Sequence, residues 1–379
     1  MNFTLSKEHQ LAQNLFREFA DKEVAPLAHE IDETERFPIE TVEKMKKLGF
    51  LGIPYKKEYG GQGCDDLTYV LMMEQLGRVC GSTAIIASVH TSLCCGALNN
   101  AGTEEQKQKY LRPLCDGTWL GAFGLTEPSA GTDAAGQCTR AVLDGDEYVL
   151  NGSKIFITNS GWADVYVIFA MTDKSQGSRG ISAFIVPANT PGFTVGKPEL
   201  KMGIRASTAC ELIFENVRIP KENLLGKEGK GFGIAMKALD GGRIGIAAQA
   251  LGLAQGALDN VIAYVKERKQ FGKPLAKLQN TQFTLADMET RVQAARLLVY
   301  SAAVAYDQGQ PISVKAAQAK LFASETASYV TNRAVQLMGG YGYMREYPVE
   351  RMMRDAKITE IYEGTSEVMR MVISGQLLK

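Results

Sequence analysis

The pattern of apolar residues changes twice along the chain, near Trp119 and again near Gly231. Between these points the sequence is rich in Thr, Val, Ile and Phe, and strand-like runs at residues 165–170 and 181–186 follow one another with frequent turns. No long helical pattern separates these runs, which favours an antiparallel sheet or barrel over alternating strand–helix–strand units. The sequence therefore predicts a β domain in the middle of the chain.

A turn signal inside this region points the same way. The tripeptide Asp144-Gly145-Asp146 separates two strand-like runs, residues 139–143 and residues 147–152. Two such runs joined through an Asp-Gly turn are typical of a β-hairpin.

The segments on either side of the β region have helical spacing. Pro26 is expected to end or kink the first helix near Ala25. The tetrapeptide at residues 103–106, Thr-Glu-Glu-Gln, is typical of a capping box at a helix N-terminus. The apolar residues that recur at helical spacing are Leu11, Leu15, Phe16 and Phe19 in the first segment and Leu285, Met288, Val292, Ala295 and Val299 in the last.

The order of these patterns predicts an α+β fold in three parts. Residues 1–120 are expected to form an N-terminal helical domain, residues 121–230 a central antiparallel β domain, and residues 231–379 a C-terminal four-helix bundle. The last assignment rests on long helical patterns that are joined by short turns.

Charge and length narrow the classes of function. The chain has 379 residues, which predicts two or three domains. Lys plus Arg and Asp plus Glu both number 42, so the formal net charge is zero. This balance argues against nucleic acid or an anionic membrane as the main partner. A local basic patch for an anionic cofactor is still compatible with it.

The cysteines and the most apolar window predict a cytoplasmic protein. The N-terminus has no basic-then-apolar layout of a signal peptide. The window at residues 82–98 is expected to be too short to span a bilayer and to form a buried helix instead. The chain has seven cysteines without a C-x-x-C motif and three histidines without ligand spacing. These patterns argue against a zinc site and favour buried free thiols in a reducing compartment.

The common nucleotide and acyl-transfer motifs do not fit. Residues 229–233 (GKGFG) are glycine-rich, but the third glycine of G-x-G-x-x-G would fall at Ile234, and no strand-then-acid unit surrounds them. No G-x-S-x-G motif or Cys/His arrangement indicates acyl transfer. The lone His90, on an apolar helix, is more simply explained as a core residue than as a pocket residue.

Four other stretches have two readings each when they are taken singly. Residues 124–136 mix hydroxyls, acids and small residues that suit a polar planar ring, but they also suit a surface turn. Residues 266–272 are basic enough to hold a pyrophosphate or simply to form a solvated helix end. Residues 336–342 fit a helix C-cap equally well. Residues 362–365, Tyr-Glu-Gly-Thr, form a turn whose Glu363 is either a base in a cleft or a solvated corner.

Together the four stretches resemble the acyl-CoA dehydrogenase family. Residues 124–136 match the family's first signature and residues 336–355 its second, residues 268–272 resemble its R-x-Q-F-G element, and residues 362–365 its Y-E-G-T. The matches occur in family order. Within the family, DGGRIG at residues 240–245 and IYEGTSEV at residues 361–368 are most similar to the short-chain, butyryl-CoA type.

The resemblance implies FAD between the β domain and the C-terminal bundle. Phe156 stands where the family more often has Trp, and Thr132 stands where many relatives have Ser. The cofactor positions carried over by matching motif are Phe123, Leu125, Thr126, Gly131, Thr132, Phe156, Ile157, Thr158, Thr365 and Glu367. Those that correspond to positions reaching a neighbouring subunit's FAD are Arg268, Phe271, Gln279, Gln336, Gly339 and Gly340. The substrate positions are Thr132, Asp240, Arg243, Tyr362 and Gly364.

The resemblance also implies the reaction, which removes two hydrogens from neighbouring carbons of an acyl thioester. Glu363 is expected to take the α-proton, while the β-hydrogen leaves as hydride to the flavin. Some relatives place the base directly before the arginine at the position of Arg243, where this chain has Gly242, so Glu363 has no rival. Burial beside flavin and acyl chain is expected to raise the pKa of Glu363.

The expected partners follow from the same resemblance. They are an acyl-CoA substrate, electron-transferring flavoprotein as the electron acceptor, and further copies of the chain in a homo-oligomer, most simply a tetramer. Three alternatives stay open at this point. They are action on a branched or aryl CoA thioester, operation as an enoyl-CoA reductase, and a non-catalytic docking role, which the presence of Glu363 disfavours.

Overall fold

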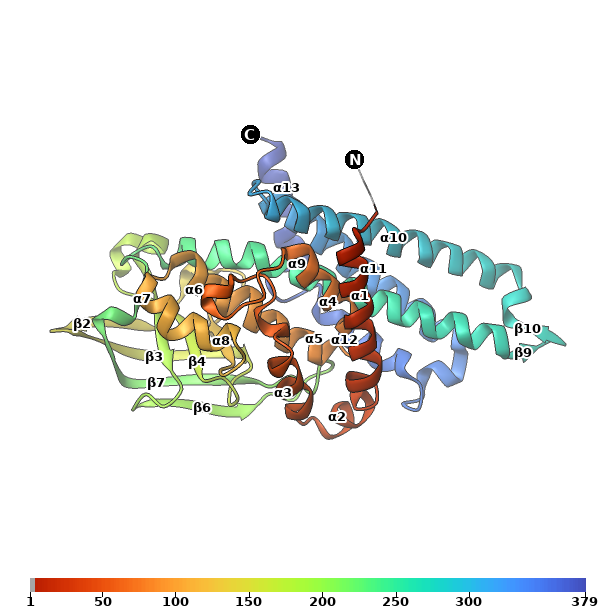
Figure 1. The fold of residues 1–379 in the computed structure, drawn as a ribbon, viewed down its shortest axis with the longest axis horizontal. Helices are drawn as coiled ribbons and strands as arrows, with labels where there is room; N and C mark the ends of the chain where they lie inside the picture. The colour runs from red at the N-terminus through yellow and green to blue at the C-terminus, as the bar shows by residue number, and fades with distance from the viewer. Residues whose placement is uncertain (1–3) are drawn as a thin grey trace.

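The computed structural model describes residues 4–379 and has three parts along its longest axis (Figure 1). The first N-terminal helices lie in the middle of the view, the last of them lie over the β sheet at one end, and long C-terminal helices extend to the other end. The N-terminal helices are α1 (Lys7–Phe19), α2 (Ala28–Thr34), α3 (Ile39–Lys47), α4 (Asp66–Val79), α5 (Gly81–Ser88), α6 (Gly96–Ala101), α7 (Glu104–Gln106) and α8 (Arg112–Cys115).

Local signals set the ends of these helices as expected. A π-helical turn, Ala20–Val24, follows α1, and a break at Pro26 separates it from α2. The capping box at Thr103 forms in full: its hydroxyl accepts from the N–H of Gln106, and the Gln106 side chain accepts from the N–H of Thr103.

The apolar face of α1 is only half buried. Phe16 and Phe19 pack edge-on against Phe50, with ring centroids 5.1 and 5.0 Å apart. Leu11 and Leu15, however, are 70% and 52% exposed. Helical spacing thus predicted the helix correctly, but it could not say which of its apolar residues a neighbouring element covers.

The apolar run in the N-terminal part forms one continuous helical stretch, Gly81–Ala101, because α5 passes through a π-helical segment, Val89–Cys95, into α6. At 21 residues it is long and apolar enough to cross a membrane by length and composition, which corrects the expectation that it is too short. Its most apolar window is 94% buried inside the protein, so the expectation of a buried helix is confirmed.

The β domain is a single eight-stranded sheet. Its strands are β1 (Gly121–Gly124), β2 (Arg140–Asp144), β3 (Glu147–Thr158), β4 (Val165–Met171), β5 (Ile181–Pro187), β6 (Phe193–Pro198), β7 (Ala209–Pro220) and β8 (Leu224–Leu225). The order is β6-β7-β3-β2-β4-β5-β8, with β1 beside β4. The predicted hairpin is β2–β3, in which Asp144 pairs with Glu147.

Most strand pairs are antiparallel, but two are not. The strand β1 runs parallel to β4 along four residue pairs, and β2 meets β4 in parallel at Arg140 and Met171. The hairpin β2–β3 lies between β1 and β4 in the sequence and acts as the crossover that lets them run the same way. The sheet is therefore mainly antiparallel, as expected, with these two parallel pairs as exceptions that the sequence did not indicate.

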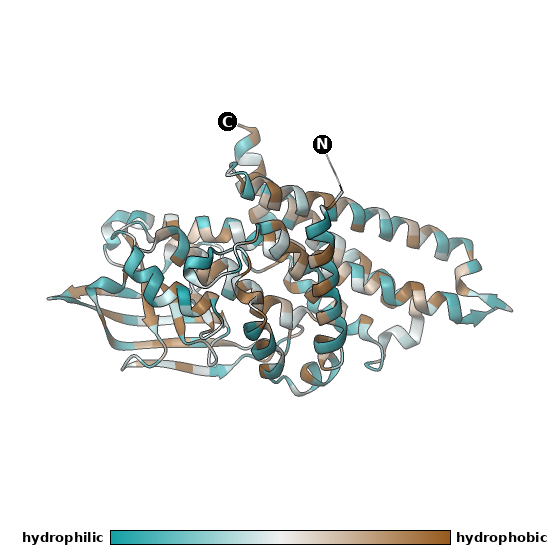
Figure 2. Cartoon of the chain, viewed as in Figure 1, coloured by the Kyte–Doolittle hydropathy of each residue, from teal (hydrophilic) through white to brown (hydrophobic). Residues whose placement is uncertain are grey.

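The C-terminal part contains α9 (Gly231–Glu267), α10 (Gln279–Asp307), α11 (Ser313–Met338), α12 (Pro348–Ile358) and α13 (Ser366–Leu377), with a small hairpin of β9 (Lys269–Gln270) and β10 (Lys273–Pro274) between α9 and α10. The predicted apolar face of α10 is confirmed, because Met288, Val292, Ala295 and Val299 are fully buried. Figure 2 shows apolar residues concentrated where the helices meet and polar residues along their outer faces.

The helical parts share one core. The largest cluster of buried apolar residues includes Leu71 on α4, Leu251 on α9, Val292 on α10 and Ala323 on α11. The pattern changes at Gly121 and Gly231, where β1 and α9 begin, as the sequence indicates. The division into three domains remains a prediction, because α4 packs into the C-terminal bundle.

Candidate active site

The turn between α12 and α13 carries Glu363. The helix α12 ends at Ile358, and α13 is capped by Thr365, whose hydroxyl accepts from the N–H of Val368 at 3.3 Å. Between the two helices Glu363 and Gly364 have φ angles of 52° and 100°. A left-handed conformation is easy for glycine but costs a residue with a Cβ about 1 kcal/mol or more. Something in the surroundings must therefore hold Glu363 in this conformation.

The carboxylate of Glu363 is buried and has no hydrogen-bond partner on either oxygen among residues 4–379. Burial raises the pKa of Glu363 to about 7, against the opposing attraction of Lys320 and Arg243. A carboxyl group with this pKa can take and return a proton near neutral pH. The solvated corner that the sequence also allowed is therefore excluded.

The carboxylate points at Gly242 on α9. A Cβ placed on Gly242 would lie 2.1 Å from Oε2 of Glu363 and 2.7 Å from Cδ2 of Leu93. The absence of a side chain at residue 242 is what leaves room for the base. The sequence singled out Gly242 as the place where a competing base is missing, and the structure brings the two positions into contact.

Polar side chains next to the turn are tied to one another. Arg243 donates from Nε to the carbonyl oxygen of Glu363 at 3.4 Å and from Nη1 to Oδ1 of Asp240 at 2.8 Å. The other oxygen of Asp240 accepts from the hydroxyl of Ser313. On the opposite side, the hydroxyl of Tyr362 donates to Gln249, an interaction that the sequence did not indicate. The structure thus brings Asp240, Arg243 and Tyr362 together around Glu363.

Lys320, on α11, is a second residue that the sequence reading missed. Its side chain is fully buried, and Nζ donates to the carbonyl oxygens of Thr359 and Gly364 at 3.0 and 2.6 Å. Burial lowers the pKa of Lys320 to about 8, although the Glu363 carboxylate opposes this shift. A signal was present in the sequence, because this lysine falls within a run of small apolar residues on a helix, where a charge is out of place.

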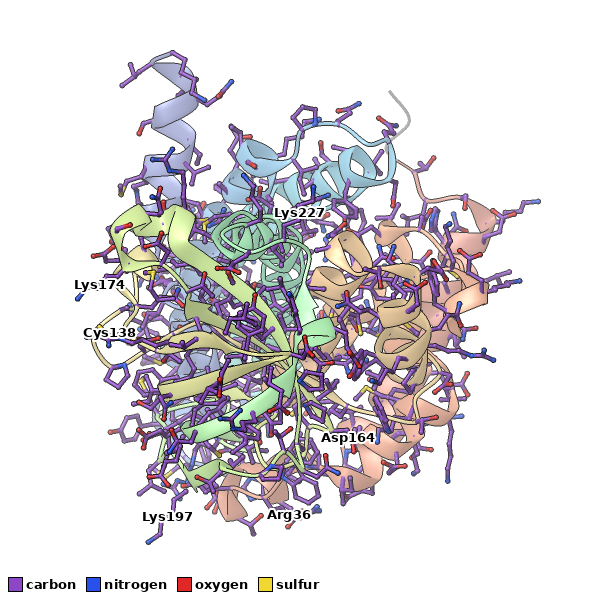
Figure 3. All side chains as sticks on the ribbon, turned by 90° about the vertical axis from the view of Figure 1, so that its left-hand side faces the viewer. Arg36, Cys138, Asp164, Lys174, Lys197 and Lys227 are labelled. Atoms are coloured by element: carbon purple, nitrogen blue, oxygen red, sulfur yellow. The ribbon has the colours of Figure 1, made fainter. Side chains whose placement is uncertain are left out.

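The loop that follows β1 is held by a buried ion pair. Oε1 of Glu127 accepts from Nζ of Lys154 at 2.7 Å and from the N–H of Thr139 at 3.0 Å. Lys154 also donates to the carbonyl oxygen of Leu125 at 3.1 Å. Burial lowers the pKa of Lys154 to about 8, opposed by the charge of Glu127. The N–H of Cys138 also donates to Glu127. Cys138 lies at the outer edge of the sheet end of the molecule (Figure 3).

The predicted cofactor residues of the β domain differ in exposure. Phe123, Leu125 and Ile157 are buried, and Thr126 and Thr158 are half-buried. Gly131 and Thr132 are exposed on the loop, and Phe156 is 61% exposed with a left-handed φ of 60°. Thr365 is half-buried and Glu367 is exposed, at the start of α13.

The remaining predicted cofactor residues lie at the end of the molecule opposite the sheet. Arg268 directly precedes the β9–β10 hairpin and Phe271 lies in its turn, and the hairpin projects from the end of the bundle opposite the sheet (Figure 1). The guanidinium carbon of Arg268 lies 5.1 Å from the ring centre of Tyr341, so the second and third motifs in chain order, residues 268–272 and 336–342, meet here. Phe271 is 90% exposed. Gln279, Gln336, Gly339 and Gly340 are exposed as well. Within one chain, these six residues therefore lie far from the predicted cofactor residues of the β domain.

His90 behaves as a core residue, as expected. It is fully buried, its Nδ1 accepts from the N–H of Gly121 at 3.0 Å, and burial lowers its pKa to about 3. Within residues 4–379 all seven cysteines are free, and no group of three or more His, Cys, Asp or Glu side chains is placed to hold a metal ion.

The chain, with its N-terminal helices, central sheet and C-terminal helices, matches known proteins along its whole length. Family models described as acyl-CoA dehydrogenase N-terminal, middle and C-terminal domains match residues 6–118, 122–217 and 229–378. The chain belongs to the acyl-CoA dehydrogenase family, and it is an oxidoreductase of this flavin-dependent family.

Similar proteins place it within the family. A short-chain specific acyl-CoA dehydrogenase of Clostridium acetobutylicum is 60% identical, with all of both chains covered. The structure of butyryl-CoA dehydrogenase from Megasphaera elsdenii has a TM-score of 0.98 at 53% identity, and again all of both chains is covered. The resemblance to the short-chain type is therefore confirmed.

A third similar protein is a chain in a structure described as the electron transferring flavoprotein of Acidaminococcus fermentans, from work towards a mechanism of flavin-based electron bifurcation. That chain has a TM-score of 0.99 at 56% identity, with all of both chains covered.

Proposed function

We propose that this protein catalyses the α,β-dehydrogenation of a short-chain acyl-CoA, with butyryl-CoA as the substrate and Glu363 as the base. The observation that carries the proposal is the buried carboxylate of Glu363, which has no partner on either oxygen and faces Gly242. Burying a carboxylate without a partner is costly, and such costs are usually retained where the group has a chemical role.

The residues present fit a bound FAD. Gly131 has no atom within 4 Å of the place where a Cβ would stand, so the loop can approach a ring closely. Phe156, which is exposed and has a left-handed φ, offers an aromatic face to a ligand. The proposed cofactor residues of the same chain are Phe123, Leu125, Thr126, Gly131, Thr132, Phe156, Ile157, Thr158, Thr365 and Glu367. When bound, the flavin supplies a hydride acceptor.

A second set of residues is proposed to hold the FAD of a neighbouring copy. They are Arg268, Phe271, Gln279, Gln336, Gly339 and Gly340. Five of them are exposed and Arg268 is half-buried, and their place at the end of the bundle far from the sheet of the same chain supports this assignment (Figure 1). It makes the active form a homo-oligomer, for which a tetramer is our proposal.

The remaining residues are proposed to bind, orient and deprotonate the substrate. Glu363 accepts the proton from the α-carbon, and its own backbone N–H polarises the thioester carbonyl. Arg243 donates to the carbonyl oxygen of Glu363, which helps to fix the peptide unit that joins Glu363 to Gly364. Tyr362 and Leu93 pack beside the carboxylate and exclude water from it. The proposed substrate residues are Thr132, Asp240, Arg243, Tyr362 and Gly364.

Electron-transferring flavoprotein is the proposed electron acceptor. This proposal is supported by the similar chain from Acidaminococcus fermentans, which comes from a structure described as that organism's electron transferring flavoprotein. A cytoplasmic location is likewise kept as a prediction.

The test is an anaerobic titration of the purified protein with a series of acyl-CoAs. Butyryl-CoA is expected to bleach the yellow flavin of the wild type, whereas Glu363→Gln retains FAD and binds butyryl-CoA without bleaching. Glu360→Gln is the matched control, because Glu360 lies three residues earlier and pairs with Lys357 instead. Normal bleaching of Glu363→Gln would remove Glu363 from its role, and a colourless protein that never takes up FAD would refute the whole proposal.

A further inference from the structure

Lys320 is one of the few lysines in this chain with a fully buried side chain. It lies on α11 among buried alanines, and its relative exposure is 0%. Lysine is almost never fully buried unless its ammonium group is paired, because removing the charge from water is costly. What the ammonium group contacts therefore indicates why the residue is there.

Both hydrogen bonds of Lys320 go to the backbone of the turn that carries the base. Nζ donates to the carbonyl oxygen of Thr359 at 3.0 Å and to that of Gly364 at 2.6 Å. These two carbonyls stand on either side of Glu363 in the sequence. A single ammonium group on α11 thus joins the end of α12 to Gly364, which directly precedes the N-cap residue of α13.

The turn needs such a tie, because its backbone is strained at the base itself. Glu363 has a φ of 52° and Gly364 a φ of 100°. Only Gly364 adopts this region without cost, so Glu363 stays there only if its neighbours are held. Relaxation of φ at Glu363 would swing the carboxylate away from Gly242.

Charges around the turn come from every element that packs on it. Lys320 on α11 and Arg243 on α9 attract the Glu363 carboxylate and lower its pKa against the effect of burial. The other charged or titratable groups that face this cluster are Asp240 on α9, Glu360 after α12, Tyr362 in the turn and Tyr69 on α4. Lys320 and Arg243 are the two cations that act on Glu363.

We propose that Lys320 is a positioning residue for Glu363: its ammonium group ties the carbonyls of Thr359 and Gly364 together and places a positive charge behind the base. The inference rests on the proposed function, in which Glu363 removes the α-proton. In this proposal Lys320 acts only through the turn, to which its ammonium group donates both of its hydrogen bonds.

Three variants separate the hydrogen bonds of Lys320 from its charge. Lys320→Met removes both, and Lys320→Gln keeps N–H donors without the charge. Lys315→Met, on the same helix, is the matched control, because the Lys315 amine reaches only the exposed side chain of Gln310. Each protein is purified with its flavin, and bleaching by butyryl-CoA is followed by anaerobic rapid mixing between about pH 5.5 and 9.5.

The expected results differ between the variants. In Lys320→Met the rate of bleaching at its high-pH plateau falls about 100-fold, since the carboxylate is misplaced. The apparent pKa of that rate rises by about one unit, because a cation near the base is lost. Lys320→Gln recovers most of the plateau rate but keeps the raised pKa. Lys315→Met matches the wild type in both quantities.

A purely structural lysine would lower thermal stability without moving the pH profile. A wild-type plateau rate or a wild-type apparent pKa in Lys320→Met therefore overturns the proposal. If that variant does not fold, the pKa in Lys320→Gln decides instead, and failure of both to fold with flavin assigns Lys320 to the fold alone. Glu363→Gln tells the two proposals apart: if butyryl-CoA bleaches it normally, the proposed base itself is wrong, whereas no bleaching combined with wild-type behaviour of the Lys320 variants refutes only the inference.

Discussion

The contact between Gly242 and Glu363 allows one residue to be tested without touching the base. In Gly242→Ala the new Cβ would lie 2.1 Å from Oε2 and 3.1 Å from the carboxyl carbon of Glu363. Non-bonded carbon–oxygen contacts need more than about 3 Å, so the carboxylate must move by about 1 Å. The carboxylate is the free end of a flexible side chain without hydrogen bonds, so it can move without disturbing the backbone.

Two opposing effects keep the stability of this variant close to that of the wild type. Replacing a glycine inside a helix by alanine stabilises the helix by about 1 kcal/mol. Crowding Glu363 and Leu93 costs about 1–3 kcal/mol. The free energy of unfolding is therefore expected to fall by no more than about 2 kcal/mol. The rate of proton removal, in contrast, is expected to fall about 100-fold, because a displacement of about 1 Å takes the base out of line.

The assay is anaerobic bleaching of the flavin by butyryl-CoA, together with a thermal unfolding curve for the same preparation. Gly241→Ala is the control: the residue is next in sequence on the same helix, and a Cβ there meets nothing within 4 Å. This control is expected to keep the wild-type rate and to be slightly more stable. A Gly242→Ala variant that bleaches at the wild-type rate would show that the carboxylate does not work from the place where the structure puts it.

Three further predictions concern Glu363, the ion pair of Lys154 with Glu127 in the loop after β1, and the β9–β10 hairpin. Because burial raises the pKa of Glu363 from 4.5 to about 7, the folded protein loses up to about 3 kcal/mol relative to Glu363→Gln as pH rises from about 4.5 to 7 and above. Denaturant unfolding of both proteins at several pH values measures this gap, and a gap independent of pH contradicts the assignment. Lys154→Met leaves Glu127 charged and buried without its cation, so it is expected to lose about 3–5 kcal/mol of stability and to retain less FAD, as seen by unfolding and by the flavin absorbance after gel filtration; Lys174→Met, in a surface turn of the same domain, is its control, and equal losses in the two variants would refute the idea. Phe271→Ser removes a ring that is 90% exposed, so the monomer is expected to fold normally while FAD retention and subunit association weaken, which light scattering and flavin content report; unchanged values for both would mean that the hairpin contacts no neighbouring copy.

Much of the fold was readable from the sequence because its signals are local. The Asp-Gly turn of the β2–β3 hairpin, the capping box at Thr103 and the apolar face of α10 each depend on residues a few positions apart. Backbone geometry converts such spacing directly into helix or strand. The same local signals could not show that Leu11 and Leu15 stay exposed, nor that β1 runs parallel to β4.

The candidate site was located by its motifs, but its physical character came from packing. The sequence by itself determined that a glutamate, a glycine and an arginine stand in the order of the family's motifs. Only the tertiary structure brought Gly242 and Lys320 to Glu363, buried the carboxylate and raised its pKa to about 7. The pKa of a carboxyl group depends on the loss of water and on charges within a few ångströms, and here those come from helices far apart in the chain. The spacing of residues along the sequence determines whether a segment forms a helix or a strand. The packing of segments that are far apart in the sequence determines that the Glu363 carboxylate is buried without a hydrogen-bond partner.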